Sequence, residues 1–270
     1  MLPEVENEPK RSRARAGAPV RRGISTARIV TIAVVFCVVL LSSLYAFHRL
    51  EQFLIRDPRF ALSGVEGDPG VIEIAGAAHA SRDQIERVFS IDLGRSVYLL
   101  PMVERRETLR NVDWVKDASI ARLWPNRVVI RVQERKPVAF MTLTSSRFAL
   151  IDDDGVILPP VSDRFTLPVL TGVRASDSLE ARRDRVHRML RLTADLGDYA
   201  RNISEIDVSD RDNLKVTVPR DGHIMTLLLG DRNYAQRYQN FLSYYSKIKR
   251  SLPNAATLDL RLDDRITAVE

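Results

Sequence analysis

The most prominent hydrophobic pattern in the chain is a run of 19 residues without a charge, from Ile29 to Phe47. A helix of this length is about 28 Å long, close to the ~30 Å hydrocarbon core of a bilayer. A cleaved signal peptide would have an apolar stretch of about 7 to 15 residues and a small-residue cleavage site, and the bulky Leu44 and Tyr45 do not suit such a site. We therefore predict one uncleaved transmembrane helix over residues 29–49, with a buried helix of a soluble domain as the alternative.

Beyond this helix, the polar and apolar positions predict a connector and a first folded region. Residues 50–70 form the connector, since residues 56–70 are rich in glycine, proline and aspartate. Ser81 followed by Gln84 has the spacing of a capping box that starts a helix. The elements expected over residues 71–136 are a strand at 71–76, helices starting at 81 and spanning 103–109, and strands at 115–123 and 128–132. The order is therefore β-α-α-β-β.

Residues 137–270 show a second pattern, in which short alternating stretches are separated by turn residues and by two long amphipathic segments. The alternation predicts strands at 138–143, 147–151, 156–158, 203–208, 214–218, 223–229, 257–262 and 266–269. The amphipathic segments predict helices at 176–196 and 232–248. The fold class is therefore α+β: a single transmembrane helix, the β-α-α-β-β unit, and a second mixed α/β domain with a mainly antiparallel sheet.

The charge of the chain is concentrated before the transmembrane helix. Residues 1–28 carry seven basic and three acidic residues, so they hold +4 of the formal charge of +6. The positive-inside rule then places the N-terminus in the cytoplasm and residues after about 50 outside. Scattered prolines and glycines predict a disordered tail, and binding to a cytoplasmic partner or to anionic lipid stays an open role for it. The small remaining charge argues against a nucleic-acid-binding domain.

Few residues outside the predicted membrane segment suggest a catalytic or metal-binding site. Asp152, Asp153 and Asp154 precede Gly155 between two apolar stretches, which fits a hairpin turn better than a metal site because the ligand spacing of a calcium loop is absent. The four histidines lack the spacing of a helical zinc pair, and Cys37, the single cysteine, lies in the apolar run. We predict no catalytic residue, metal or cofactor, and an exported enzyme stays an alternative.

Aromatic residues mark one stripe of the last long helix. Tyr234, Tyr238, Phe241 and Tyr245 recur at helical spacing, and Tyr244 lies beside the stripe. Packing in a core is the default interpretation of such a stripe. Tyrosine is amphipathic, so some of these rings are also candidates for contact with a partner protein.

The β-α-α-β-β order just outside a membrane anchor resembles a POTRA domain, and particular residues make the resemblance closer. The sequence WVKDASIARLWPNRVVIRVQERKPVAF, residues 114–140, is similar to the FtsQ family of bacterial cell division proteins, called DivIB in Gram-positive cells. Its motif positions include Arg122, Trp124, Pro125, Glu134, Arg135 and Pro137. The stretches FALIDDDGVIL and LDLRLDD, residues 148–158 and 258–264, are similar to the β domain that follows POTRA in this family.

This resemblance implies a non-catalytic scaffold at the division septum of the inner membrane, which binds FtsB-like and FtsL-like bitopic proteins and other division proteins. A terminal strand at a sheet edge can accept a strand from another chain. The residues implied in partner binding are Asp259, Leu260, Arg261, Leu262, Asp263 and Asp264, with Tyr234 and Tyr238 on the neighbouring helix. The family often has tyrosine where this chain has Leu262. The alternatives are a strand capped by its own charges and, for the whole protein, a POTRA-bearing component of polypeptide transport or assembly.

Overall fold

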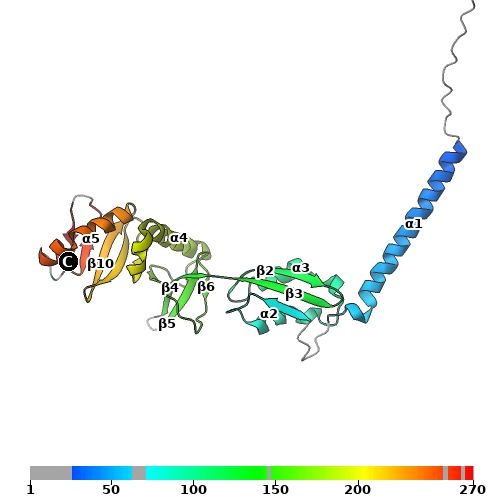
Figure 1. Cartoon of the computed structure of the whole chain (residues 1–270), viewed down its shortest axis with the longest axis horizontal. Helices are drawn as coiled ribbons and strands as arrows, with labels where there is room; N and C mark the ends of the chain where they lie inside the picture. Colours follow the sequence, from blue (N-terminus) through cyan, green and yellow to red (C-terminus); the bar gives the residue numbers. More distant parts are fainter. Residues whose placement is uncertain (1–25, 63–70, 145–146, 252–254, 263–264, 270) are drawn as a thin grey trace, which may run out of the picture. The chain divides into compact units, whose positions relative to one another are not determined.

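The N-terminal unit of the protein is built around one long helix. The computed structural model describes residues 26–62, 71–144, 147–251, 255–262 and 265–269, and the chain divides into residues 1–56 and 57–270 (Figure 1). Most of the predicted tail, residues 1–25, lies outside the described residues. In the first unit, α1 spans Thr26–Arg56.

Helix α1 is longer than the predicted segment 29–49. Apolar residues continue past the uncharged run at Leu50, Phe53 and Leu54, and the helix ends just before Asp57, whose backbone is extended ahead of Pro58. A residue before proline disfavours the helical conformation, which explains this end point. By length and composition, α1 can cross a membrane, and no part of its most apolar stretch is buried within the protein. A buried soluble helix is therefore not what the described residues show.

Residues 71–136 form the predicted β-α-α-β-β unit. Its elements are β1 (Ile72–Ala75), α2 (Arg82–Val88), α3 (Met102–Leu109), β2 (Val115–Leu123) and β3 (Arg127–Glu134), with short 3₁₀ turns η2 (Ser90–Asp92) and η3 (Val97–Leu99) between the helices. The strand order is β1-β3-β2, with β1 parallel and β2 antiparallel to β3. The capping prediction is confirmed, because the Ser81 hydroxyl accepts a hydrogen bond from the Gln84 amide.

The helices of this unit pack on one face of the three-stranded sheet. Ile85 of α2, Leu109 of α3 and Ile130 of β3 are fully buried in one core. A buried ion pair joins the turn η2 to α3, since the guanidinium of Arg105 donates to both carboxylate oxygens of Asp92 at 2.6 and 3.0 Å. Hydrophobic burial therefore holds the helices against the sheet, and the ion pair fixes α3 to the turn that follows α2.

The second region is a nine-stranded mixed sheet in the order β12-β11-β10-β9-β8-β7-β4-β5-β6. Its strands are β4 (Pro137–Thr144), β5 (Arg147–Asp152), β6 (Ile157–Leu158), β7 (Val169–Thr171), β8 (Glu205–Asp207), β9 (Leu214–Arg220), β10 (His223–Gly230), β11 (Thr257–Asp259) and β12 (Thr267–Ala268). Five of the eight strand pairs are antiparallel, which confirms the predicted sheet type. Strand β7 was not predicted, because its three residues are defined by parallel pairing with β4 and β8.

The described residues of this sheet domain include two helices, α4 (Leu179–Leu196), followed by the 3₁₀ turn η4 (Gly197–Asn202), and α5 (Tyr234–Ser251). Helix α4 begins three residues later than predicted because the Ser178 hydroxyl caps the amide of Ala181. Val186 and Leu192 of α4 share one core with Phe241 of α5 and Leu258 of β11. The aromatic stripe therefore lies largely against the sheet, and α5 borders the C-terminal strands.

Candidate functional site: the C-terminal sheet edge and its groove

The sheet ends at a strand whose outer side carries no partner strand among the described residues. Strand β12 pairs antiparallel with β11, at Leu258 with Ala268 and at Asp259 with Thr267. The Val269 amide donates to the Thr257 carbonyl at 3.0 Å. Because successive amides in a strand point to opposite sides, the Ala268 amide points away from β11. Both residues of β12 are exposed, so this edge can accept another strand.

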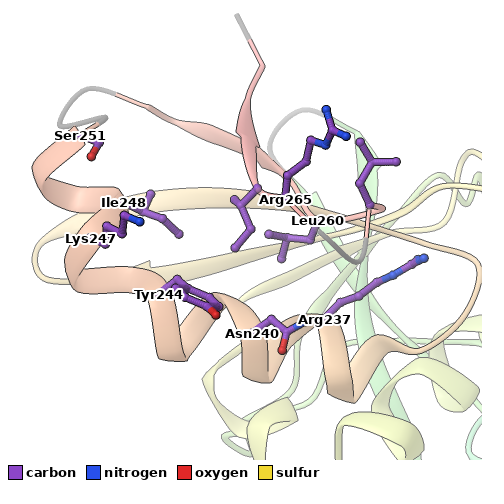
Figure 2. A pocket seen from close by; sticks show the side chains of 10 residues that line it. Arg237, Asn240, Tyr244, Lys247, Ile248, Ser251, Leu260 and Arg265 are labelled. Carbon is purple, nitrogen blue, oxygen red and sulfur yellow. The ribbon is translucent and has the colours of Figure 1, made fainter.

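A groove of about 600 Å³ lies beside this edge, between α5 and the chain around β11 and β12 (Figure 2). It is lined by Arg237, Asn240, Tyr244, Lys247, Ile248, Ser251, Leu260, Leu262, Arg265 and Ile266. Tyr244 and Leu262 expose 57% and 51% of their surface, which is high for large apolar side chains. The described lining residues include Lys247 and Arg265 and no acid. The groove therefore combines apolar surface with positive charge.

Arg237 builds the inner wall of this groove. Its side chain is buried, and its Nη1 and Nη2 donate to the carbonyls of Leu229 and Arg261 at 2.6 and 2.8 Å. These bonds tie the start of α5 to the ends of β10 and β11. Gly230 leaves room for the guanidinium, because a Cβ there would lie 2.7 Å from Nη1. Arg237 was not predicted from the sequence as a site residue, although its position next to Tyr238 of the aromatic stripe indicates that it faces the core.

Strand β11 ends at Asp259, earlier than the predicted strand 257–262, although the Leu260 amide still donates to the Leu228 carbonyl of β10 at 3.0 Å. Arg261 donates from Nε and Nη2 to the two carboxylate oxygens of Asp259 at 2.9 and 2.6 Å, and its amide also donates to that carboxylate. The side-chain bond from Arg261 lowers the pKa of Asp259, and the same bond raises the pKa of Arg261. The two charges thus satisfy each other, as the alternative of a strand capped by its own charges expects.

The remaining partner-binding candidates are placed very differently from one another. Leu260 is 2% exposed and packs in the core, so its side chain is not available to a partner. Leu262 is exposed in the groove. Asp263 and Asp264 lie outside the described residues.

The tyrosines of the aromatic stripe also differ from one another in their burial. Tyr238 is 2% exposed and contacts Tyr199 and Phe241 in the core, and burial raises the pKa of its hydroxyl. Tyr234 is half-buried and donates its hydroxyl to the Asp231 carbonyl at 2.8 Å. Core packing is therefore the role that the contacts of Tyr238 show. The ring that reaches the groove is Tyr244, one position outside the stripe.

The POTRA motif residues have structural roles away from this groove. One carboxylate oxygen of Glu134 accepts hydrogen bonds from the amides of Ala78, His79 and Ala80 at 2.7 to 2.8 Å. Its other oxygen lies 2.9 Å from His79 Nδ1, while His79 Nε2 lies 2.9 Å from Asp163. The hydrogen bonds from Asp163 and Glu134 raise the pKa of His79. Glu134 therefore organises the loop before α2 and links it to residue 163.

The other motif residues lie at the two ends of the β2–β3 pair. At one end, Arg122 donates to the Leu100 carbonyl at 2.7 Å, and the turn contains a cis peptide bond between Trp124 and Pro125. At the other end, Arg135 lies just before β4, whose first residue is Pro137. These contacts join the first sheet to the loops and strands next to it.

The aspartate cluster is a hairpin turn, as predicted, because β5 and β6 pair antiparallel on either side of it. Asp152 is fully buried, and it accepts from Arg135 at 2.7 Å and from the amides of Asp154 and Val156. Lys116 lies 3.0 Å from Asp153 and 3.3 Å from Asp154. The three carboxylates come close enough to bind a cation, but these basic and amide groups already satisfy them.

Among the described residues, one long apolar helix, a POTRA-like unit and a mixed sheet domain with an open C-terminal edge define a membrane-anchored POTRA protein, and comparison with known proteins agrees. Residues 70–135 match the model described as POTRA domain, FtsQ-type, and residues 139–261 match the model described as Cell division protein FtsQ/DivIB, C-terminal.

Proteins named Cell division protein FtsQ are similar along most of the chain. The protein from Koribacter versatilis is 31% identical over 274 residues, which cover 97% of this chain and 78% of the relative. The protein from Alcanivorax borkumensis is 26% identical over 255 residues, covering 93% and 89%, and that from Nitrosospira multiformis is 25% identical over 224 residues, covering 82% and 88%. The chain belongs to the FtsQ/DivIB family of cell division proteins, a family of structural division proteins and not of enzymes.

Proposed function

We propose that this protein is a non-catalytic scaffold of the divisome, the assembly of membrane proteins that builds the division septum. In this proposal α1 crosses the inner membrane, residues 1–28 lie in the cytoplasm, and residues 57–270 lie in the periplasm. The basic residues before α1 support this orientation. Family membership speaks for a division role and not for the alternative of polypeptide transport.

The observation that carries the proposal is the open edge of β12 beside the groove of α5. Strand addition would satisfy the outward-pointing backbone groups of β12 and extend the sheet by one strand. The adjoining groove would receive apolar side chains of the partner against Tyr244 and Leu262. The backbone hydrogen bonds of a strand edge do not distinguish one sequence from another, so the groove would determine which partner binds.

The partner that fits this site is an acidic, partly apolar segment of a small bitopic protein. Lys247 lines the groove beside the exposed ring of Tyr244 and favours negatively charged side chains in a partner. We propose an FtsB-like protein, paired with an FtsL-like protein, as the occupant. We also propose a division of roles between residues 71–136, which would contact other division proteins, and residues 137–270, which would hold this pair.

Two pairs of variants test the docking site in the full chain, with the periplasmic segment of the organism's FtsB-like protein as the probe. Ala268→Pro removes the outward-pointing amide of β12, whereas Ala268→Val keeps it. Leu262→Asp places a charge in the groove, whereas Phe148→Asp changes a side chain of similar exposure, 53%, on β5. We expect Ala268→Pro and Leu262→Asp each to weaken binding by tenfold or more, about 1.4 kcal/mol, and the two controls to bind normally.

The controls decide how each outcome is interpreted. Thermal unfolding of all four variants must stay close to that of the wild type, since the substituted side chains are exposed. Undiminished binding by Ala268→Pro would exclude strand addition at β12. Undiminished binding by Leu262→Asp would exclude the groove as part of the docking site.

A further inference from the structure

One end of the POTRA unit is connected directly to α1 by the chain. The 3₁₀ turn η1 (Pro58–Phe60) begins two residues after the helix ends at Arg56. Ala61 then forms a β-bridge with Ser96, and the Leu62 amide donates to the Arg95 carbonyl at 2.8 Å. The chain that leaves the membrane segment therefore enters the POTRA unit at this end and is fixed there.

The β2–β3 turn lies at the same end and is unusually apolar. The rings of Phe60 and Trp124 pack edge to face with centroids 5.6 Å apart. Trp124 nevertheless exposes 48% of its surface, and the neighbouring Leu123 is also exposed. We call these three residues, Phe60, Leu123 and Trp124, the aromatic tip. Trp114, the other tryptophan of the chain, is buried in the core of the same unit.

Basic side chains surround the aromatic tip. Arg59 precedes Phe60 and pairs with Asp57 through two short contacts, of 3.1 Å from Nε and 2.8 Å from Nη2. Arg127 is paired in register with Leu123 across the turn and is exposed, as is Arg95. Tryptophan is enriched at both membrane–water interfaces, and an arginine beside it can keep its charged head among the headgroups while its stem lies on apolar surface.

We propose that the aromatic tip lies in the headgroup layer of the membrane that α1 crosses. The uncharged run of α1 ends at Phe47, so the last nine residues of the helix continue about 13 Å past the hydrocarbon core to Arg56. Phe60 follows Arg56 by four residues, which extend over at most about 14 Å. The tip thus stays within reach of the headgroups, and the indole of Trp124 supplies both an apolar ring and a polar N–H for this layer.

The lipid surface fits this tip better than a protein partner does. A stable protein interface buries about 800 Å² on each side, whereas the tip consists of three side chains with arginines around them. Anionic headgroups would attract those arginines. The tip would hold the POTRA unit in one orientation above the membrane and so limit the height at which the docking edge of β12 is presented. This inference rests on α1 as a membrane anchor and is independent of the proposed FtsB-like partner.

Fluorescence quenching in proteoliposomes that contain the full chain tests the proposal, because the protein has only two tryptophans. The vesicles contain phosphatidylglycerol, phosphatidylethanolamine and a lipid brominated either near the carbonyl end or near the methyl end of its acyl chains. Trp124→Phe identifies the emission of Trp124, and the buried Trp114 serves as an internal reference. Flotation after alkaline washing shows separately whether α1 anchors the protein.

In vesicles that pass the flotation test, we expect bromine near the carbonyl end to remove most of the Trp124 emission and bromine near the methyl end to remove much less. Arg127→Glu should reduce this quenching, while Arg164→Glu, a charge change outside the tip, should not. Equal emission in brominated and ordinary lipid would overturn the proposal. A Trp124 signal that changes only when another division protein is added would also overturn it and would assign the tip to a protein contact.

Discussion

Arg237 gives the sharpest prediction about how the groove of the proposed docking site is held together. Replacing it with methionine keeps the length of the side chain but removes both hydrogen bonds, to the Leu229 and Arg261 carbonyls. Hydrogen bonds from a charged donor contribute about 1.5 to 3 kcal/mol each, and the ones lost here leave carbonyls without their buried donor. Allowing for partial replacement by water, Arg237→Met should lower the free energy of unfolding by about 2 to 4 kcal/mol.

Thermal unfolding of the full chain in detergent, followed by near-ultraviolet circular dichroism, measures this loss. At about 3 °C per kcal/mol for a domain of this size, the melting temperature should fall by roughly 6 to 12 °C. Arg232→Met is the matched control, because Arg232 lies just before α5 and is exposed, so its loss should cost less than about 0.5 kcal/mol. Gly230→Ala should also destabilise, since its Cβ would meet Arg237 and its φ is +75°. Equal stability of Arg237→Met and Arg232→Met would refute the anchoring role.

Two further predictions concern the contacts of the POTRA motif. Arg135→Met leaves the fully buried Asp152 without its cation and should destabilise the protein by about 3 to 5 kcal/mol, measured by thermal unfolding. Full stability of this variant would contradict the role of the pair. The double variant Arg135→Met with Asp152→Asn should recover part of the lost stability. The pKa of His79 is raised by its bonds to Asp163 and Glu134. Protonated His79 therefore stabilises the fold below about pH 6.5, the usual pKa of a free histidine. This stabilisation is lost as the pH rises through the raised pKa of His79 in the folded protein. Asp163→Asn should therefore flatten the fall in melting temperature above pH 6.5, and an unchanged pH profile would exclude this linkage.

Much of the fold follows from local patterns in the sequence. The uncharged run predicts the membrane-spanning helix because chain length and side-chain transfer energy decide insertion. The capping Ser81 and the alternation along β2 and β3 predict the POTRA unit for equally local reasons. Strand β7 was not predicted, because its three residues form a strand only by pairing with segments distant in the sequence. Val169, for example, pairs with residues 140 and 205.

The resemblance indicated the C-terminal strand region for the proposed docking site, but not which side chains there are exposed. The resemblance suggested Leu260, and the aromatic stripe suggested Tyr238, yet both side chains are buried, because apolar periodicity there reports the core and not the surface. Tyr244 and Lys247 reach the groove from α5, and Arg237 shapes its wall. Which side of α5 stays exposed depends on where the C-terminal strands pack, and such tertiary contacts cannot be inferred from the local sequence pattern.

Localisation in dividing cells tests the central claim most directly. A fluorescent protein fused to the cytoplasmic N-terminus should gather at midcell before constriction, and depletion of the protein should give filamentous cells with unfinished septa. Evenly labelled membranes together with normal division after depletion would contradict a role as a divisome scaffold.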